Sequence, residues 1–193
     1  MTRIAVIYHS GYGHTKLQAE AVHEGAASVE GVEAVLMTAE EATDRMADLE
    51  GFDGMIWGSP TYMGTVSAPM KAFIDATSKP WMEHRWKDKV AAAFTNSSSP
   101  SGDKVNTLQT FAVLAAQHGM IFVGQGELPE GYNPDFSGEA DEAVNRLGGF
   151  LGAMAQSENR EPGPDNPPSG DIKTARLHGV RVAEATKRWM AGR

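Results

Sequence analysis

Short apolar runs alternate with amphipathic stretches along the chain. The first run, IAVIY, is rich in β-branched and aromatic residues, as a buried parallel strand is, and five runs in all are candidate strands. They occupy residues 4–8, 32–37, 54–57, 90–94 and 120–123. Between them, apolar residues recur at three- and four-residue spacing, as on the buried face of a helix. The pattern therefore predicts five strands that alternate with helices.

The first helix is expected over about residues 16–29 and the last over 171–190, with Asp171 as the N-terminal cap of the last. The clearest apolar stripes, in the first, third and fourth helices, are Ala19, Val22, Ala26 and Val29; Met70, Phe73, Ile74 and Thr77; and Leu108, Phe111, Ala112 and Ala115. Stripes at this spacing face a protein core, so we do not assign them to a cofactor.

Strands that alternate with helices form an α/β fold with a parallel sheet and helices on both of its faces. Such sheets bind ligands at the carboxyl ends of their strands. The 193 residues are expected to form one domain, residues 1–193. The tract 160–170 contains four prolines and is expected to be a surface loop.

Composition excludes several kinds of partner and chemistry. With 17 basic and 25 acidic residues, the net charge is −8, which argues against nucleic-acid and anionic-membrane partners. The absence of cysteine excludes disulfides, thiolate metal sites and catalytic thiols. There is no apolar run long enough to span a membrane and no secretory leader, so we expect a cytoplasmic protein.

The loop after the first strand, SGYGHT at residues 10–15, has the chemistry of an anion site. The unpaired N–H groups at a helix start can bind an anion, and Ser10 and Thr15 add hydroxyl groups. Gly11 and Gly13 allow a close or left-handed backbone. The loop lacks both GxxxxGK[ST] and GxGxxG, which favours one terminal monophosphate, such as that of FMN. A plain strand-to-helix turn is the alternative.

Two later loops carry unusual chemistry at the same predicted edge of the sheet. Residues 58–65, GSPTYMGT, combine a stiff turn and a hydroxyl with the flat or polarizable side chains of Tyr62 and Met63. Residues 95–102, TNSSSPSG, offer hydroxyl and amide groups for the polar edge of a heterocycle or a ribityl chain. Because the loops should converge, we expect them to form one site.

These motifs resemble the WrbA type of flavodoxin-like NAD(P)H:quinone oxidoreductases. The matching stretches are VIYHSGYGHT, GSPTYMGTVSAPMKAFIDATSKPW, FTNSSSPSG, LAAQHGM and TARLHGVRVA. The resemblance implies a flavodoxin-like three-layer α/β/α sandwich around a five-stranded parallel sheet of order 2-1-3-4-5. It also implies one FMN, a homo-oligomer, and two-electron, ping-pong hydride transfer from NAD(P)H through FMN to a quinone.

The resemblance also implies site residues. The FMN phosphate is expected among Ser10, Tyr12, Gly13, His14 and Thr15. The ribityl chain and ring are expected against Pro60, Thr61, Tyr62, Met63 and Gly64, and the polar edge of the ring against Thr95, Asn96, Ser97, Ser98 and Gly102. Trp81 and His118 match positions near the exposed ring face, partly across subunits, and His118 could protonate the quinone. Otherwise Trp81 is a half-buried surface aromatic and His118 a favourable helix C-terminal residue.

Two other functions on the same fold remain open, a flavodoxin-type electron-transfer protein and an NAD(P)H-dependent FMN, azo or nitro reductase. Residues 37–49 are expected to be a short connection, where the WrbA type has an insertion that supports tetramer contacts. The choice between dimer and tetramer therefore stays open. So does the choice between NADH and NADPH, because no arginine is clearly placed for a 2′-phosphate.

Overall fold

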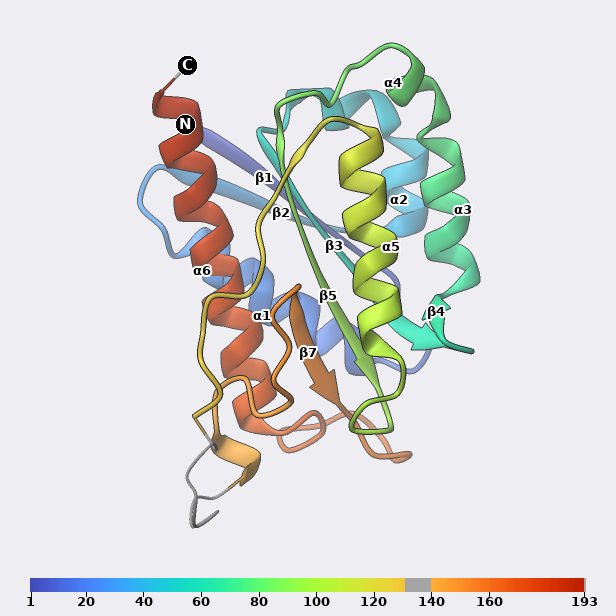
Figure 1. Cartoon of the computed structure of the whole chain (residues 1–193), viewed down its shortest axis with the longest axis vertical. Helices are drawn as coiled ribbons and strands as arrows, with labels where there is room; N and C mark the ends of the chain where they lie inside the picture. The colour runs from blue at the N-terminus through green and yellow to red at the C-terminus, as the bar shows by residue number, and fades with distance from the viewer. Residues whose placement is uncertain (131–139, 193) are drawn as a thin grey trace.

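A computed structural model describes residues 1–130 and 140–192. Helices cover both faces of a central sheet (Figure 1). The strands are β1 (Thr2–Tyr8), β2 (Val32–Thr38), β3 (Gly54–Tyr62), β4 (Thr65–Val66), β5 (Val90–Ser97), β6 (Ile121–Phe122) and β7 (Ala153–Gln156). The α-helices are α1 (His14–Ala27), α2 (Ala39–Asp44), α3 (Ala68–Ala76), α4 (Ser78–Met82), α5 (Lys104–Gln117) and α6 (Ser169–Ala191). Two 3₁₀-helices are η1 (Met46–Gly51) and η2 (Ala140–Glu142).

The sheet confirms the predicted flavodoxin-like class, but it has seven strands instead of five within residues 1–130 and 140–192. Its order is β2-β1-β3-β5-β6, all parallel, with β4 antiparallel to β3 and β7 parallel to β5. The fifth position is thus shared, because β6 pairs with the start of β5 and β7 with its end. The chain leaves the sheet after Phe122 and returns at Ala153, so the predicted strand 120–123 forms only the shorter part.

The core has two halves, one on each face of the sheet. Along β1, Ile4 and Val6 pack with the buried residues of α1 and α6. Ala5 and Ile7 point the other way, into the core formed with α2, α3 and α5. This alternation follows from the two-residue period of a strand, and it explains why the strands are apolar on both faces.

β3 and β5 continue further than their apolar runs. β3 ends at Tyr62 and β5 at Ser97, so the loops expected at 58–65 and 95–102 both begin as strand. Met63 and Gly64, with φ of 48° and 88°, form the turn of the β3–β4 hairpin. Positive φ at both central residues is what a type I′ turn requires. The strands thereby carry polar residues beyond the core to the site edge.

Two local expectations were wrong. The N-cap of α6 is Pro168, so Asp171 lies inside the helix, where Arg146 binds its carboxylate. Residues 37–49 are not a bare connection but contain α2, which begins with a capping box between Thr38 and Glu41. The capping box satisfies two backbone N–H groups at once, which makes so short a helix stable.

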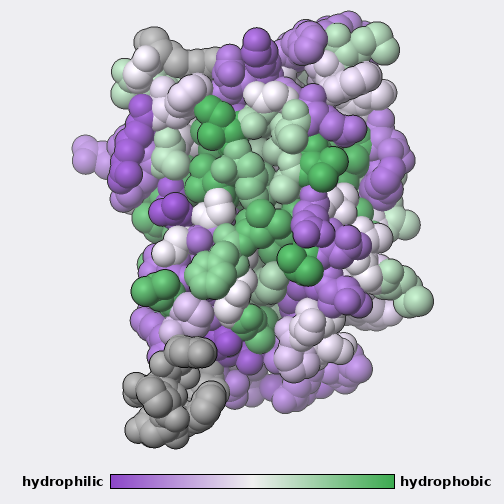
Figure 2. All heavy atoms as spheres, in the orientation of Figure 1, coloured by the Kyte–Doolittle hydropathy of each residue, from purple (hydrophilic) through white to green (hydrophobic). Residues whose placement is uncertain are grey.

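Hydrophobic side chains gather on the face between α5 and α6, over the edge formed by β6 and β7 (Figure 2). Leu128 and Phe150, which lie in the chain between α5 and α6, are exposed hydrophobic residues. Among the residues that the structure describes, no helix combines the length and the apolar character needed to cross a membrane.

Stability should fall in mild acid. Burial lowers the pKa of both His118 and His178 to about 4, against about 6.5 in an unfolded chain. The folded state holds the neutral imidazoles, so this stability is complete above about pH 6.5 and is lost as the pH falls towards 4. We expect the urea midpoint to drop between pH 7 and pH 5, and to drop less in His178→Met. If the urea midpoint fell equally between pH 7 and pH 5 in the wild type and in His178→Met, this prediction would be wrong.

Candidate functional site

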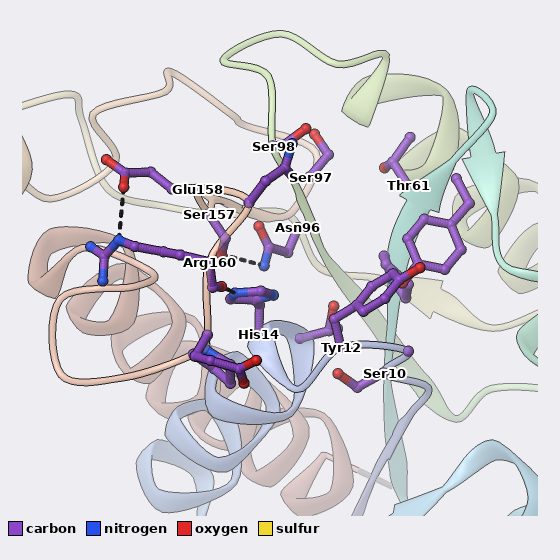
Figure 3. Close-up of a pocket in the computed structure, with 17 residues that line it drawn as sticks. Ser10, Tyr12, His14, Thr61, Asn96, Ser97, Ser98, Ser157, Glu158 and Arg160 are labelled. Carbon is purple, nitrogen blue, oxygen red and sulfur yellow. Dashed lines mark hydrogen bonds and ion pairs between the residues drawn. The ribbon is translucent and has the colours of Figure 1, made fainter.

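One cavity of about 640 Å³ lies at the carboxyl ends of β1, β3 and β5. Its volume falls within the range of roughly 300–1,000 Å³ typical of small-molecule sites. The three predicted loops meet there, as Figure 3 shows, together with a fourth segment. The lining residues are Ser10, Gly11, Tyr12, His14, Thr15, Pro60, Thr61, Tyr62, Asn96, Ser97, Ser98, Ser157, Glu158, Asn159, Arg160, Glu161 and Pro162.

The first loop presents the start of α1 to the cavity. Gly13 has φ of 94° and is the N-cap, and its N–H donates to Ser10 Oγ at 3.0 Å. The first backbone hydrogen bond of the helix runs from Leu17 N to Gly13 O, so the N–H groups of residues 14–16 are unpaired within the helix. Unpaired N–H groups and the positive end of a helix dipole form an anion site.

The floor is a chain of buried hydroxyl groups. Thr61 Oγ1 lies 2.8 Å from Thr95 Oγ1 and 2.7 Å from Thr107 Oγ1. Thr95 Oγ1 donates in turn to Ser59 O at 2.7 Å. These bonds join β3, β5 and α5 behind the cavity, so they stabilise the position of Thr61 on its wall.

Asn96 has an unused acceptor beside the cavity. The side chain is 3% exposed, and its Nδ2 donates to Ser157 Oγ at 2.7 Å. Its Oδ1 is buried and has no hydrogen-bond partner among the described residues. A buried amide oxygen left unpaired is costly, which favours a ligand that donates a hydrogen bond to it.

Lys104 supports the loop that follows β5. Its side chain is fully buried, and Nζ donates to Ser99 O and, at 3.3 Å, to Pro100 O. Burial lowers the pKa of Lys104 to about 8. The buried lysine therefore holds the conformation of this loop from inside the protein. Its place in the sequence, at the start of a helix, did not indicate this role.

The fourth segment was not predicted. Residues 157–162, which follow β7 and precede α6 in the chain, line the cavity, and we name them the strap. The predicted surface loop is present up to the start of α6 at Ser169, and its first residues, Arg160, Glu161 and Pro162, also line the cavity. There was no usable signal for the strap in the sequence, because β7 is only four residues long and its pairing with β5, which brings the strap to the same sheet edge, is seen only in the structure.

Five predicted binding residues lie behind or beside the cavity instead of on its wall. Gly13 caps α1, and Thr95 is buried in the hydroxyl chain. Met63 and Gly64 form the hairpin turn, with Met63 fully exposed. Gly102 has φ of 54°, and a Cβ there would lie 2.3 Å from Ser97 Oγ, so glycine lets the loop close.

Trp81 and His118 do not line the cavity but lie in another part of the structure. They line a separate hollow between α3, α4 and α5 that shares no described residue with the cavity. His118 follows the far end of α5, roughly 20 Å from its start at 1.5 Å per residue. His118 is 3% exposed, stacks on Trp86 at 4.4 Å and lies 3.0 Å from Thr77 Oγ1 through Nε2.

The cavity residues fit a flavin mononucleotide. The α1 start and the Ser10 hydroxyl suit one terminal phosphate without any lysine or arginine of the P-loop kind. The orphaned Asn96 Oδ1 suits an N–H or hydroxyl donor of a ribityl chain or a ring edge. The rings of Tyr12 and Tyr62, 6.3 Å apart and edge to face, give an aromatic surface at the mouth.

Comparison with known proteins agrees with this geometry. A family model described as NADPH-dependent FMN reductase matches residues 23–134, more than half of the chain. The flavodoxin FldP of Pseudomonas aeruginosa is 42% identical, over 95% of this chain and 96% of that protein. An NAD(P)H dehydrogenase (quinone) of Archaeoglobus fulgidus is 32% identical, over 97% and 99%. The crystal structure of a WrbA-like flavodoxin from Agrobacterium tumefaciens aligns with a TM-score of 0.72 and 39% identity, over 97% and 99%.

The chain belongs to the NADPH-dependent FMN reductase family. Within it, the chain is a flavodoxin-like protein of the WrbA type, as its motifs imply. It is a flavoprotein oxidoreductase with FMN as its cofactor.

Proposed function

We propose that the protein catalyses FMN-dependent transfer of two electrons from NAD(P)H to a quinone. The observation that carries the proposal is a cavity that is polar inside and aromatic at its mouth. Tyr12 is 76% exposed and Tyr62 37% exposed at that mouth. Nicotinamides and quinones are both planar rings that stack on such surfaces. Relatives named NAD(P)H dehydrogenase (quinone), at about 30% identity, support this reading.

The chain's own residues place and orient the cofactor. The N–H groups that begin α1 and the Ser10 hydroxyl would bind the phosphate, and Asn96 Oδ1 would accept a hydrogen bond from the ribityl chain or ring. FMN held there would supply the redox chemistry by which hydride from NAD(P)H, together with one proton from solvent, reduces a quinone to a quinol. Tyr12 and Tyr62 shape one mouth for both substrates, so the nicotinamide leaves before the quinone enters.

Trp81 and His118 are proposed to act at the flavin of a second copy of the chain. Their hollow is remote from the cavity of their own chain, so only an oligomer can bring them to a flavin. Trp81, 46% exposed, can stack on a substrate. With the pKa of His118 lowered to about 4, its imidazole is neutral at pH 7 in the single chain, so a protonating role requires the second copy to change its surroundings.

A flavodoxin-type electron carrier is the second candidate. The protein named flavodoxin FldP, at 42% identity, favours it. A net charge of −8 suits docking to a basic redox partner. The two functions share the cavity and differ in whether a nicotinamide reduces the flavin.

The deciding assay loads the purified protein with FMN under anaerobic conditions and adds NADH or NADPH, then benzoquinone. We expect the flavin absorbance to bleach with a nicotinamide and to return fully with quinone, and initial rates to give parallel double-reciprocal lines. His118→Ala should lower quinone turnover with little change in FMN affinity if the second-copy role holds. Retained FMN that ignores both nicotinamides would overturn the reductase and leave the carrier.

A further inference from the structure

The strap, residues 157–162, is a preformed wall of the cavity. Six consecutive residues contribute to the lining, more than any of the three predicted loops contributes in one run. The family match ends at residue 134, so the strap lies outside the stretch by which the family is recognised.

Asn166 closes the strap on itself. The side chain is 1% exposed, and its Oδ1 accepts from Glu158 N at 2.8 Å. Its Nδ2 donates to Arg160 O and Glu161 O, both at 3.1 Å. One buried side-chain amide therefore binds three residues of the strap, and these hydrogen bonds fix the conformation of the strap.

The strap also contacts the anion loop directly. His14 Nε2 lies 2.8 Å from Arg160 O (Figure 3). A Cβ at Gly13 would lie 2.8 Å from Pro162 Cγ, so the two segments touch at the cap of α1. The space beyond the N–H groups of α1 is thus bounded by Pro162 and the strap backbone.

The strap offers no free cation to a second phosphate. The Arg160 guanidinium pairs with Glu158 at 2.7 Å and with Asp165 at 3.1 Å. Glu158 and Glu161 themselves line the cavity. Two carboxylates near a phosphate site repel further negative charge, which a single monophosphate held on backbone N–H groups tolerates better than a pyrophosphate.

We propose that the strap, positioned by Asn166, makes the site selective for a flavin mononucleotide over a flavin dinucleotide. A ligand that continued past the first phosphate would meet Pro162 and the strap backbone, and its second phosphate would lie near the Glu161 carboxylate and the Glu158–Arg160 pair. This inference rests on FMN as the cofactor but not on the reaction. A protein that bound FMN and oxidised no nicotinamide would overturn the proposed function alone.

The test measures dissociation constants for FMN and FAD by quenching of flavin fluorescence, with circular dichroism to verify folding. We expect the wild type to prefer FMN by at least about 30-fold, roughly 1.5 powers of ten. Pro162→Gly should reduce that ratio at least about fivefold by opening the wall. Asn166→Ala should reduce the ratio and weaken FMN binding about tenfold.

Pro164→Gly is the matched control, because the same change falls outside the strap and away from the cavity lining. Its ratio should equal that of the wild type. Equal affinity of the wild type for FMN and FAD would overturn the proposal. So would equal weakening of both flavins in Pro162→Gly, or a drop in ratio in Pro164→Gly as large as that in Pro162→Gly. If Asn166→Ala fails to fold, the two proline variants decide the question.

Discussion

Gly179→Ala should lower the free energy of unfolding by about 3 kcal/mol, although alanine favours a helix. A Cβ at Gly179 would lie 2.1 Å from Val22 O and 2.9 Å from Val22 C. On the facing helix, a Cβ at Gly25 would lie 2.0 Å from Arg176 O. The clashes are with backbone, so no side-chain rotation relieves them, and α1 and α6 must separate.

The intrinsic preference for alanine over glycine in a helix, about 1 kcal/mol, acts in the opposite direction and is smaller. Urea unfolding followed by circular dichroism measures the difference. Gly192→Ala, at the end of the same helix, meets only ordinary contacts at 3.7 Å or more and should stay within about 0.5 kcal/mol of the wild type. A stabilised Gly179→Ala would mean that the helices do not pack this closely.

Asp171→Ala should lower the free energy of unfolding by about 4 kcal/mol, because it leaves the Arg146 guanidinium without its carboxylate partner. The carboxylate is 1% exposed and accepts from Arg146 Nε and Nη2, each at 2.9 Å, and from Gln156 N at 2.8 Å. Burial raises the pKa of Asp171 although both partners oppose this, so the charge is held against a large desolvation cost. Gln156 also donates to Ser98 O at 3.1 Å, so FMN affinity should fall as well.

The same argument predicts that a joint replacement is milder. Arg146→Met with Asp171→Leu removes both charges and should be less destabilised than Asp171→Ala alone, since a buried ion pair replaced by apolar groups is often neutral. Glu184→Ala breaks the exposed pair with Arg188 and is the control, with an expected change under about 0.5 kcal/mol. If the double variant unfolded as readily as the single one, the loss would come from packing and not from charge.

The order of strands and helices could be predicted from the sequence because it depends on local burial. Strand and helix periods appear directly in the spacing of apolar residues, as in Ile4 to Tyr8 and in the Leu108–Phe111–Ala115 stripe of α5. The rule that ligands bind at the carboxyl ends of parallel strands then brought three loops to one edge. The sharing of one edge position by β6 and β7 could not be predicted, because strands of two and four residues are too short to show a periodic pattern of apolar residues.

By itself the sequence determined the fold class and picked out the loop expected to bind an anion, since both follow from the types and spacing of residues near one another in the chain. Only the tertiary structure decided which distant groups meet. It brought Pro162 onto Gly13 and the carbonyl of Arg160 beside the His14 ring. It also separated His118 from the cavity. Such contacts depend on where the chain returns after more than a hundred residues, and no local spacing of residue types records that.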